Sequence, residues 1–279
     1  MKPAAFEIAR PASLAEAARL LAAHDGAAKV MAGGQSLGPM LNLRLARPSL
    51  IVDVTGISEL TQVERSSDHI TLGACVTTAN VEDERAGAET LPMLATVARR
   101  IAYRAVRNRG TVGGSLCHAD PAADWMTTLA ALGADAIITD GTRRRTVAIA
   151  RFMLGAYETA LQPGENLEAV RNPKLSSSAR WGYYKVCRKA GEFALAIGAV
   201  LSDPDRGVLR AVIGATDGAP LVADDARALF GGGRDLSAAA LDENAAARLF
   251  GGSRAGADAS RRRLHLTALA RAAEEARSP

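Results

Sequence analysis

The sequence predicts a mixed α+β protein with two parts, and three observations support this. Short strand-like apolar runs alternate with amphipathic helical segments through the first 170 or so residues. The composition then shifts to short polar residues around Pro173–Ser178. With 279 residues, of which 48% are hydrophobic, the chain can bury a sizeable core and about two domains. We therefore predict domains at 1–176, subdivided near residue 56, and 177–279.

The first 56 residues predict a small α/β unit. Ser13–Glu16 forms a capping box ahead of a helix with apolar residues at helical spacing. A strand at Ala28–Ala32 runs directly into Gly33 and Gly34, and a second strand follows at Leu50–Val54. The unit thus places a glycine turn at the end of a strand.

The next 120 residues repeat this arrangement with a second glycine turn. Asp140-Gly141 is the signal of a hairpin turn between two of the strands. The predicted elements are strand Ile70–Ala74, helix Leu91–Tyr103, glycine turn Gly110–Ser115, helix Trp125–Leu132, hairpin strands Ala136–Thr139 and Arg145–Ile149, and strand Asn166–Arg171.

Beyond the polar segment we predict a small antiparallel sheet and a helical bundle. The strands are Gly182–Val186, Ala194–Ser202 and Leu209–Ala215, and the helices are Asp224–Leu229, Ala238–Leu249 and Ala259–Ala276.

Composition narrows the functional classes. A net charge of +4 without a basic, aromatic-studded stripe argues against nucleic-acid binding. No apolar run is long enough to predict a membrane span, and the N-terminus lacks the apolar core of a signal peptide. Cys75, Cys117 and Cys187 stand alone, which argues against disulfides, structural zinc or an iron–sulfur cluster in this chain. These features favour a cytoplasmic protein without a metal site of its own.

Two segments carry the chemistry. One is Ala32-Gly33-Gly34-Gln35-Ser36-Leu37, and the other is Arg109-Gly110-Thr111-Val112-Gly113-Gly114-Ser115, followed by Asp120–Asp124. Backbone N–H groups in such turns can converge on an anion. Each turn alone is equally typical of an ordinary connection, but together they predict a diphosphate held from two sides, with Asp124 suited to a ribose hydroxyl. No Rossmann or P-loop motif is present.

At these residues the sequence resembles the FAD-binding medium subunits of molybdenum hydroxylases, such as carbon monoxide and xanthine dehydrogenases. The resemblance covers nearly the whole chain. It rests on MAGGQSLGPMLNLRLARPSLIVDV (31–54), VRNRGTVGGSLCHADPAAD (106–124), GAYETALQPGENLEAV (155–170) and YYKVCRKAGEFALAIGAV (183–200). It implies a vanillyl-alcohol-oxidase (PCMH-type) FAD-binding fold of two α/β subdomains, with a C-terminal domain of the carbon monoxide dehydrogenase flavoprotein type.

The resemblance also implies roles for individual residues. Lys185 is implied to lie near the isoalloxazine edge, with a solvated surface lysine as the alternative, and Phe193 to shield one flavin face, with a core position as the alternative. Leu167 is implied to touch the flavin or adenine, and Asp124 to bind ribose. FAD is implied to be bound non-covalently. The residues implied to hold its phosphate region are Ala32, Gly33, Gly34, Gln35, Ser36, Leu37, Thr111, Gly113, Gly114 and Ser115.

The family further implies partner subunits. A large subunit would hold the molybdenum cofactor and a small one two [2Fe–2S] clusters, in a dimer of heterotrimers. This chain would pass electrons to a quinone, NAD⁺ or O₂, and would need no catalytic acid or base. Two alternatives stay open: a self-sufficient flavoenzyme, either UDP-N-acetylenolpyruvoylglucosamine reductase-like or an oxidase, and a flavin-free binding module.

Overall fold

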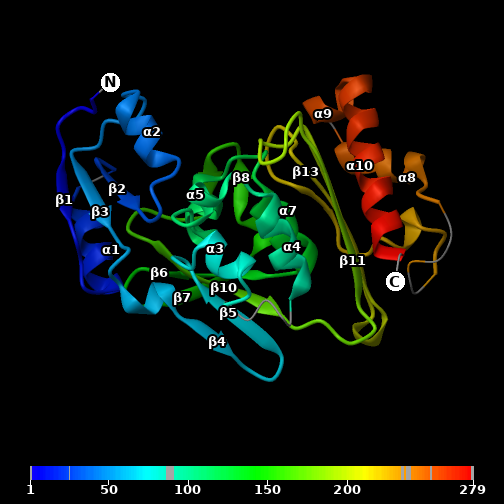
Figure 1. The fold of residues 1–279 in the computed structure, drawn as a ribbon, viewed down its shortest axis with the longest axis horizontal. Helices are drawn as coiled ribbons and strands as arrows, with labels where there is room; N and C mark the ends of the chain where they lie inside the picture. The colour runs from blue at the N-terminus through cyan, green and yellow to red at the C-terminus, as the bar shows by residue number, and fades with distance from the viewer. Residues whose placement is uncertain are drawn as a thin grey trace.

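The structure is a computed structural model. Its three larger sheets follow one another along the described part of the chain (Figure 1). The structure describes residues 2–24, 26–85, 91–233, 236, 240–251 and 253–277. A three-stranded sheet lies at the N-terminal end, a five-stranded sheet in the middle and a four-stranded sheet at the C-terminal end. This is the mixed α+β fold that the sequence predicts.

The N-terminal sheet is parallel, in the order β1-β3-β2. Its strands are β1 (Glu7–Ala9), β2 (Ala28–Met31) and β3 (Leu50–Asp53). Helix α1 (Leu14–Ala23) begins at Ser13, whose hydroxyl accepts a hydrogen bond from the N–H of Glu16, as the capping box predicts. Helix α2 (Leu37–Asn42) follows β2, which is an edge strand. The first glycine turn therefore lies at the end of an edge strand.

The middle sheet is antiparallel, in the order β4-β5-β10-β6-β7. Its central strand β10 comes last along the chain and joins the two earlier hairpins. The bounds are β4 (Val63–Arg65), β5 (His69–Gly73), β6 (Asp135–Thr139), β7 (Arg144–Ala148) and β10 (Asn166–Pro173), with a small separate hairpin of β8 (Met153–Gly155) and β9 (Glu158–Thr159).

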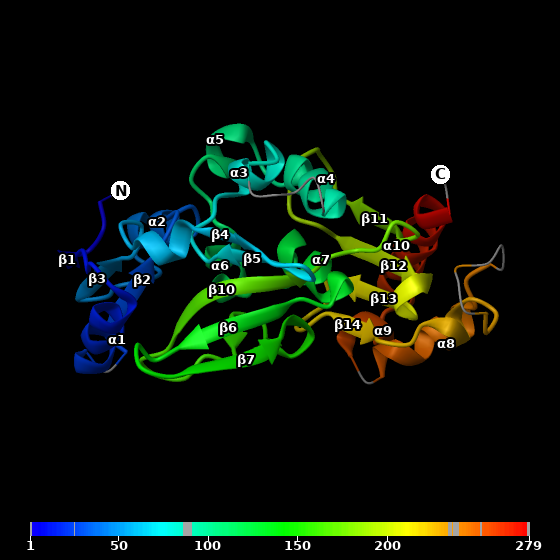
Figure 2. The ribbon, with the colours of Figure 1, turned by 90° about the horizontal axis from the view of Figure 1, so that it is seen from below.

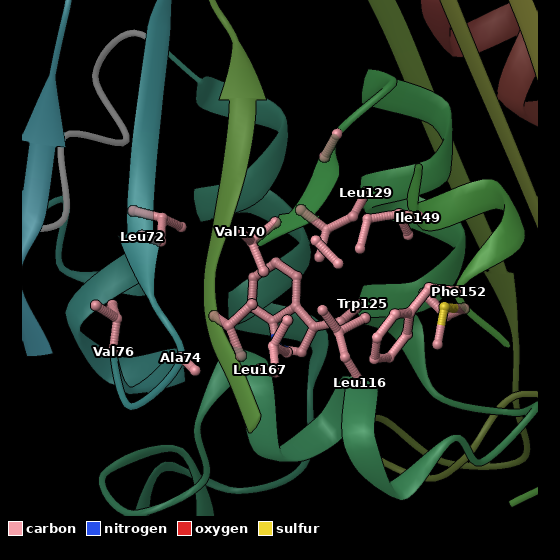
Figure 3. Packing of buried hydrophobic residues seen from close by; sticks show 14 of the residues in the cluster. Leu72, Ala74, Val76, Leu116, Trp125, Leu129, Ile149, Phe152, Leu167 and Val170 are labelled. Carbon is pink, nitrogen blue, oxygen red and sulfur yellow. The ribbon is translucent and has the colours of Figure 1, made fainter. Parts of the chain in front are cut away.

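Helices cover one side of the middle sheet, and large side chains are buried in the core there. They are α3 (Thr78–Glu82), α4 (Pro92–Arg100), α5 (Arg104–Arg107), α6 (Val112–His118) and α7 (Asp124–Leu132). Figure 3 shows Trp125 of α7 packed beside Leu167 and Val170 of β10. Trp125 and Phe152 are almost completely buried, and burying a side chain of this size contributes roughly 1.5–3 kcal/mol to folding.

The C-terminal sheet is antiparallel, in the order β11-β12-β13-β14. Its strands are β11 (Arg180–Val186), β12 (Ala196–Asp203), β13 (Val208–Gly214) and β14 (Leu221–Ala223). Helix α10 (Ala259–Arg277) lies on one face, and α7 packs on the other (Figures 1 and 2). The approach of α10 is so close that a Cβ on Gly198 would overlap the carbonyl of Ala268. Helix α7 is thus shared by the middle and C-terminal sheets.

Several predicted helices differ from those in the structure. The predicted helix Leu91–Tyr103 ends early, at Arg100, because Ile101 bridges to Gly191 and Ala102 has a positive φ of 45°. Helix α5, which starts at Arg104, was not predicted. The segment Asp224–Leu229 forms only one 3-10 turn, Arg227–Leu229. The predicted helix Ala238–Leu249 starts outside the described residues, and its described part contains α8 (Glu243–Ala247) and a 3-10 turn.

Some short helices were not predicted or were only partly predicted. Helix α6 was expected only as a turn that leads to a helix start, whereas the glycines themselves lie in its first turn. The short helices α8 and α9 (Arg254–Ala257) contact α10, which itself covers the sheet. Among the described residues, no helix has both the length and the apolar character to cross a membrane. The predicted domain boundaries stay a prediction; the sheets change at similar positions.

Candidate functional site

The first glycine turn joins β2 to α2 and has the shape of an open loop. Gly34 has a φ of 70°, a left-handed conformation that costs other residues roughly 1–2 kcal/mol. The carbonyl of Gly34 accepts the N–H of Gly38 at 2.8 Å, and that of Gly33 accepts the Gln35 side-chain amide at 3.2 Å. In the described part of the chain, the N–H groups of residues 33–36 have no recorded hydrogen-bond acceptor. Because unpaired N–H groups need a partner, this row of donors can receive an anion.

The second glycine turn begins α6 and its N–H groups are used within the protein. The hydroxyl of Thr111 caps the helix by accepting the N–H of Gly114 at 3.0 Å. The N–H of Val112 donates to the carbonyl of Val76 at 3.0 Å, that of Gly113 to Ala74 at 2.9 Å, and that of Ser115 to Thr111 at 3.1 Å. Across the described residues, the Thr111 N–H and the Ser115 hydroxyl have no recorded partner. This segment therefore offers a ligand fewer donors than the sequence predicts.

The structure places the two turns against each other. A Cβ on Gly33 would overlap the carbonyl oxygen of Arg109, so only glycine fits there. A Cβ on Gly114 would lie 3.7 Å from the Cβ of Ala32, and one on Gly110 would lie 3.8 Å from Gln35 Cγ. Segments about 75 residues apart in sequence thus adjoin, with the two glycine turns in van der Waals contact. A diphosphate held between them stays a prediction.

Asp124, the first residue of α7, is buried in a polar cluster with the C-terminal sheet. Its carboxylate accepts hydrogen bonds from the Tyr183 hydroxyl at 2.6 Å and from Lys185 Nζ at 3.0 Å. Burial raises the pKa of Asp124 above its ordinary value, and the charge of Lys185 opposes that shift. Burial also raises the pKa of Tyr183, which therefore stays protonated. Its hydroxyl donates a hydrogen bond to the carboxylate. A ribose hydroxyl would have to share a carboxylate that already accepts two hydrogen bonds.

The burial of Lys185 and the exposure of Phe193 exclude the alternative role that the sequence left open for each residue. The side chain of Lys185 is only 4% exposed, so it is not a solvated surface lysine. Phe193, in the loop between β11 and β12, is 63% exposed and is not a core residue. Leu167, at the start of β10, is 5% exposed and packs in the core beside Trp125 (Figure 3).

Sequence reasoning missed the residues that support these positions. The sequence did not single out Tyr183 as a site residue, yet its hydroxyl orients Asp124. Arg107 donates to the carbonyls of Ile101 and Ala102 and pairs with Glu82 at 2.7 Å. No local signal in the sequence indicates either partnership, because both join residues distant in the chain.

Cys75 is the buried cysteine, and burial raises the pKa of its thiol to about 12, so it is protonated at neutral pH. Cys117, in α6, is exposed in this chain. Over the described residues, there is no group of three or more His, Cys, Asp or Glu side chains that could hold a metal ion.

Comparisons with known proteins identify the family. Residues 4–175 match the family described as "FAD binding domain in molybdopterin dehydrogenase". The chain is 39% identical over 202 residues to the caffeine dehydrogenase subunit beta of Pseudomonas sp. (strain CBB1), covering 72% of this chain and 68% of that protein. It is 36% identical over 196 residues to the carbon monoxide dehydrogenase medium chain of Hydrogenophaga pseudoflava, covering 70% and 68%.

Solved structures agree over the whole length. Reconstituted CO dehydrogenase from Oligotropha carboxidovorans contains a chain that superposes with a TM-score of 0.89 at 30% identity, covering 99% of both chains. Quinoline 2-oxidoreductase from Pseudomonas putida 86 gives a TM-score of 0.83 at 32% identity, covering 99% of this chain and 98% of that one. The chain therefore belongs to the family of FAD-binding medium subunits of molybdenum hydroxylases, of the carbon monoxide dehydrogenase medium-chain type.

Proposed function

We propose that the chain binds FAD non-covalently and passes electrons from a partner's [2Fe–2S] cluster to an external acceptor. The observation that carries this proposal is the pair of adjoining glycine turns with unassigned N–H donors at residues 33–36. The two turns pack so closely that a Cβ at Gly33 would overlap the carbonyl oxygen of Arg109. This arrangement suits a diphosphate, which needs several donors and no side chain in the way.

The first turn would hold the diphosphate through Gly33, Gly34, Gln35 and Ser36. The second would add the Thr111 N–H and the Ser115 hydroxyl, and would brace the first turn through the carbonyl of Arg109. The fold would be that of the vanillyl-alcohol-oxidase type, divided at about residues 56 and 176. Bound FAD would supply one- and two-electron redox chemistry, while the protein binds and orients it.

Lys185 would adjust the electrostatics of the flavin. Its ammonium is buried and paired with one carboxylate, that of Asp124. A positive charge in a partly desolvated place favours a negative charge nearby more strongly than it would in water. We therefore expect Lys185 to favour the anionic reduced flavin. Phe193 would cover one face of the ring from its exposed loop.

Substrate oxidation would occur in another subunit. By analogy with the relatives, the chain would assemble with a large molybdenum subunit and a small [2Fe–2S] subunit, as a dimer of heterotrimers in the cytoplasm. Both carboxylate oxygens of Asp124 accept hydrogen bonds from the protein. This chain would need no general acid or base of its own.

The test is to purify the chain alone and together with its partner subunits. Alone, it should carry one FAD that dithionite reduces, and it should oxidise neither an organic substrate nor NADPH. Co-expressed with the two partner subunits, it should show flavin bleaching on addition of substrate. Turnover by the isolated chain would favour a self-sufficient flavoenzyme, and a colourless chain that does not take up added FAD would contradict the proposal.

A further inference from the structure

A second recess lies beside the predicted FAD site but is formed by other residues. It has a volume of about 510 Å³ and opens between the end of α4, helix α5 and the segment after β11. Of the residues predicted to bind FAD, only Lys185 lines it. The bridge between Ile101 and Gly191 joins α4 to the segment after β11 at this place. Its size falls within the range of ordinary small-molecule sites, which is roughly 300–1,000 Å³.

The lining of this recess is strongly basic. Arg99, Arg100, Arg104, Arg107 and Lys185 all contribute to it, and among the described residues no Asp or Glu lines it. Such a concentration of one sign of charge in a concave surface attracts an anion.

The charges are neutralised to different degrees. Arg104 binds Asp83 through two hydrogen bonds of 2.6 Å, and Arg107 pairs with Glu82, so these two are largely neutralised. Arg99 pairs with Glu84 at 3.2 Å, but both side chains are more than half exposed, which makes that pair weak. Arg100 donates to the carbonyl of Tyr183 at 2.8 Å and has no recorded carboxylate partner within the described ranges. The free positive charge of the recess is thus concentrated at Arg100.

A second cation lines the recess from a buried position. The side chain of Lys185 is 4% exposed, and its ammonium pairs with Asp124 at 3.0 Å. An ammonium has three N–H donors, and one carboxylate does not satisfy all of them. The spare donors of Lys185 are therefore available to an acceptor within the recess.

The recess also offers an aromatic surface. Tyr103 lines it and is 67% exposed, although a tyrosine of this kind is usually half-buried. Arginine and tyrosine together suit a ligand that combines phosphate oxygens with a flat ring, because guanidinium groups bind phosphate and aromatic faces stack on rings.

We propose that this recess binds a nucleotide-class ligand, with its phosphates on Arg100 and Arg99 and its ring on Tyr103. The site shares only Lys185 with the predicted FAD site, and its ligand binding is measured separately from FAD binding. The ligand class is defined by two features that must act together: negative phosphate oxygens and a planar ring.

Calorimetric titration of the FAD-loaded chain with three probes tests this. ADP should bind, adenosine should bind much more weakly, and inorganic pyrophosphate should bind without help from Tyr103. Arg100→Gln should weaken ADP binding by about tenfold or more, because a charged hydrogen bond is lost. Tyr103→Ala should weaken ADP about tenfold but leave pyrophosphate unchanged, because only stacking is lost.

Arg143→Gln serves as the matched control, since Arg143 is an exposed arginine in the β6–β7 turn and does not line the recess. It should leave ADP binding unchanged. Flavin absorbance per chain, measured in every variant, shows separately whether FAD binding has failed. The proposal is overturned if ADP does not bind, if adenosine binds as tightly as ADP, or if Arg100→Gln and Arg143→Gln behave alike. Loss of partner-subunit assembly in Arg100→Gln without ADP binding would also overturn it, in favour of an acidic protein surface.

Discussion

The two glycine turns have nearly the same composition and different hydrogen bonding. In the first, the N–H groups of residues 33–36 have no recorded acceptor in the described part of the chain. In the second, Val112, Gly113, Gly114 and Ser115 all donate to groups of the protein itself. In the function we propose, the first turn therefore binds the anion, whereas the second mainly holds the first in place.

The reason lies in what surrounds each turn. The first follows β2, an edge strand, and within the described residues no acceptor is recorded for its N–H groups. The second packs against the connection after β5, where the carbonyls of Ala74 and Val76 accept its N–H groups. Helix α6 begins at the second turn, and the next helix, α7, begins at the buried Asp124. Changes after the second turn should therefore affect stability first, and changes in the first turn should affect FAD binding first.

The largest expected effect comes from Asp124→Asn. This change removes the carboxylate that neutralises Lys185, whose side chain is 4% exposed. Breaking a buried ion pair by removing one partner costs roughly 3–5 kcal/mol. We expect the free energy of unfolding of the apo chain, measured by urea denaturation, to fall by about this amount.

A double variant separates the ion pair from other effects of this change. In Asp124→Asn with Lys185→Met no buried charge is left unpaired, so much of the lost stability should return. If Asp124→Asn weakens FAD binding while the apo chain keeps its stability, the carboxylate is a ligand group, and the assignment of this region to a holding role is wrong.

Gly33→Ala should have the next largest effect, and mainly on FAD. The added methyl would collide with the Arg109 carbonyl and push the two turns apart. Forcing atoms into a packed place costs about 1–3 kcal/mol, and the separated donors would no longer meet one diphosphate. FAD affinity, measured by flavin fluorescence quenching, should fall further than stability does.

Gly38→Ala is the matched control for this change. Gly38 lies one helical turn later in α2, and a Cβ there would have no heavy atom within 4 Å. Alanine in a helix is about 1 kcal/mol more favourable than glycine, so this variant should bind FAD normally and unfold no earlier. Equal loss of FAD in both variants would show that α2, and not the turn, controls binding.

Several features of the two turns and of the sheets could be predicted from the sequence. The positions of Gly33–Gly34 and Gly113–Gly114, the strand before the first turn and the alternating strands of the C-terminal sheet follow from local patterns. Turn residues and apolar periodicity act over a few residues, so a sequence displays them directly.

Other features depend on contacts that no local pattern records. The use of the Gly113 N–H group depends on the carbonyl of Ala74, which is distant in the sequence. Likewise, the burial of Lys185 depends on Asp124, which lies 61 residues away in the sequence. The early end of one predicted helix, at Arg100, follows from the pairing of Ile101 with Gly191. Tertiary contacts decide each of these outcomes, so local propensity could not.

The response of stability to acid pH should depend on a residue outside both turns. His265 in α10 is fully buried, its ring nitrogens have no recorded partner, and it contacts Phe250. Burial lowers its pKa to about 4, with a further contribution from Arg261, while Asp217 opposes the shift. Because the unfolded chain takes up the proton at a higher pH than the folded chain, stability is lost as the pH falls through the range between these two pKa values.

Between about pH 7 and about pH 5 this one residue should cost about 2 kcal/mol of unfolding free energy. His265→Leu should reduce that loss, as seen in urea midpoints at the two pH values. FAD should remain bound in the folded fraction at the lower pH. Release of FAD ahead of unfolding would mean that a titrating group near the turns matters more than His265.

The smallest expected effect compares two helix caps. Thr111 and Thr77 each accept a backbone N–H at the start of a helix, at 3.0 Å and 3.1 Å. Thr→Val at either position removes the acceptor and keeps the shape, so each should cost about 1 kcal/mol of stability. If the second turn mainly holds the first, Thr111→Val should weaken FAD binding only a few-fold, because the donors of residues 33–36 remain. A Thr111→Val chain as stable as Thr77→Val but unable to bind FAD would show that the second turn binds the cofactor as directly as the first, and the contrast between the two turns would be lost.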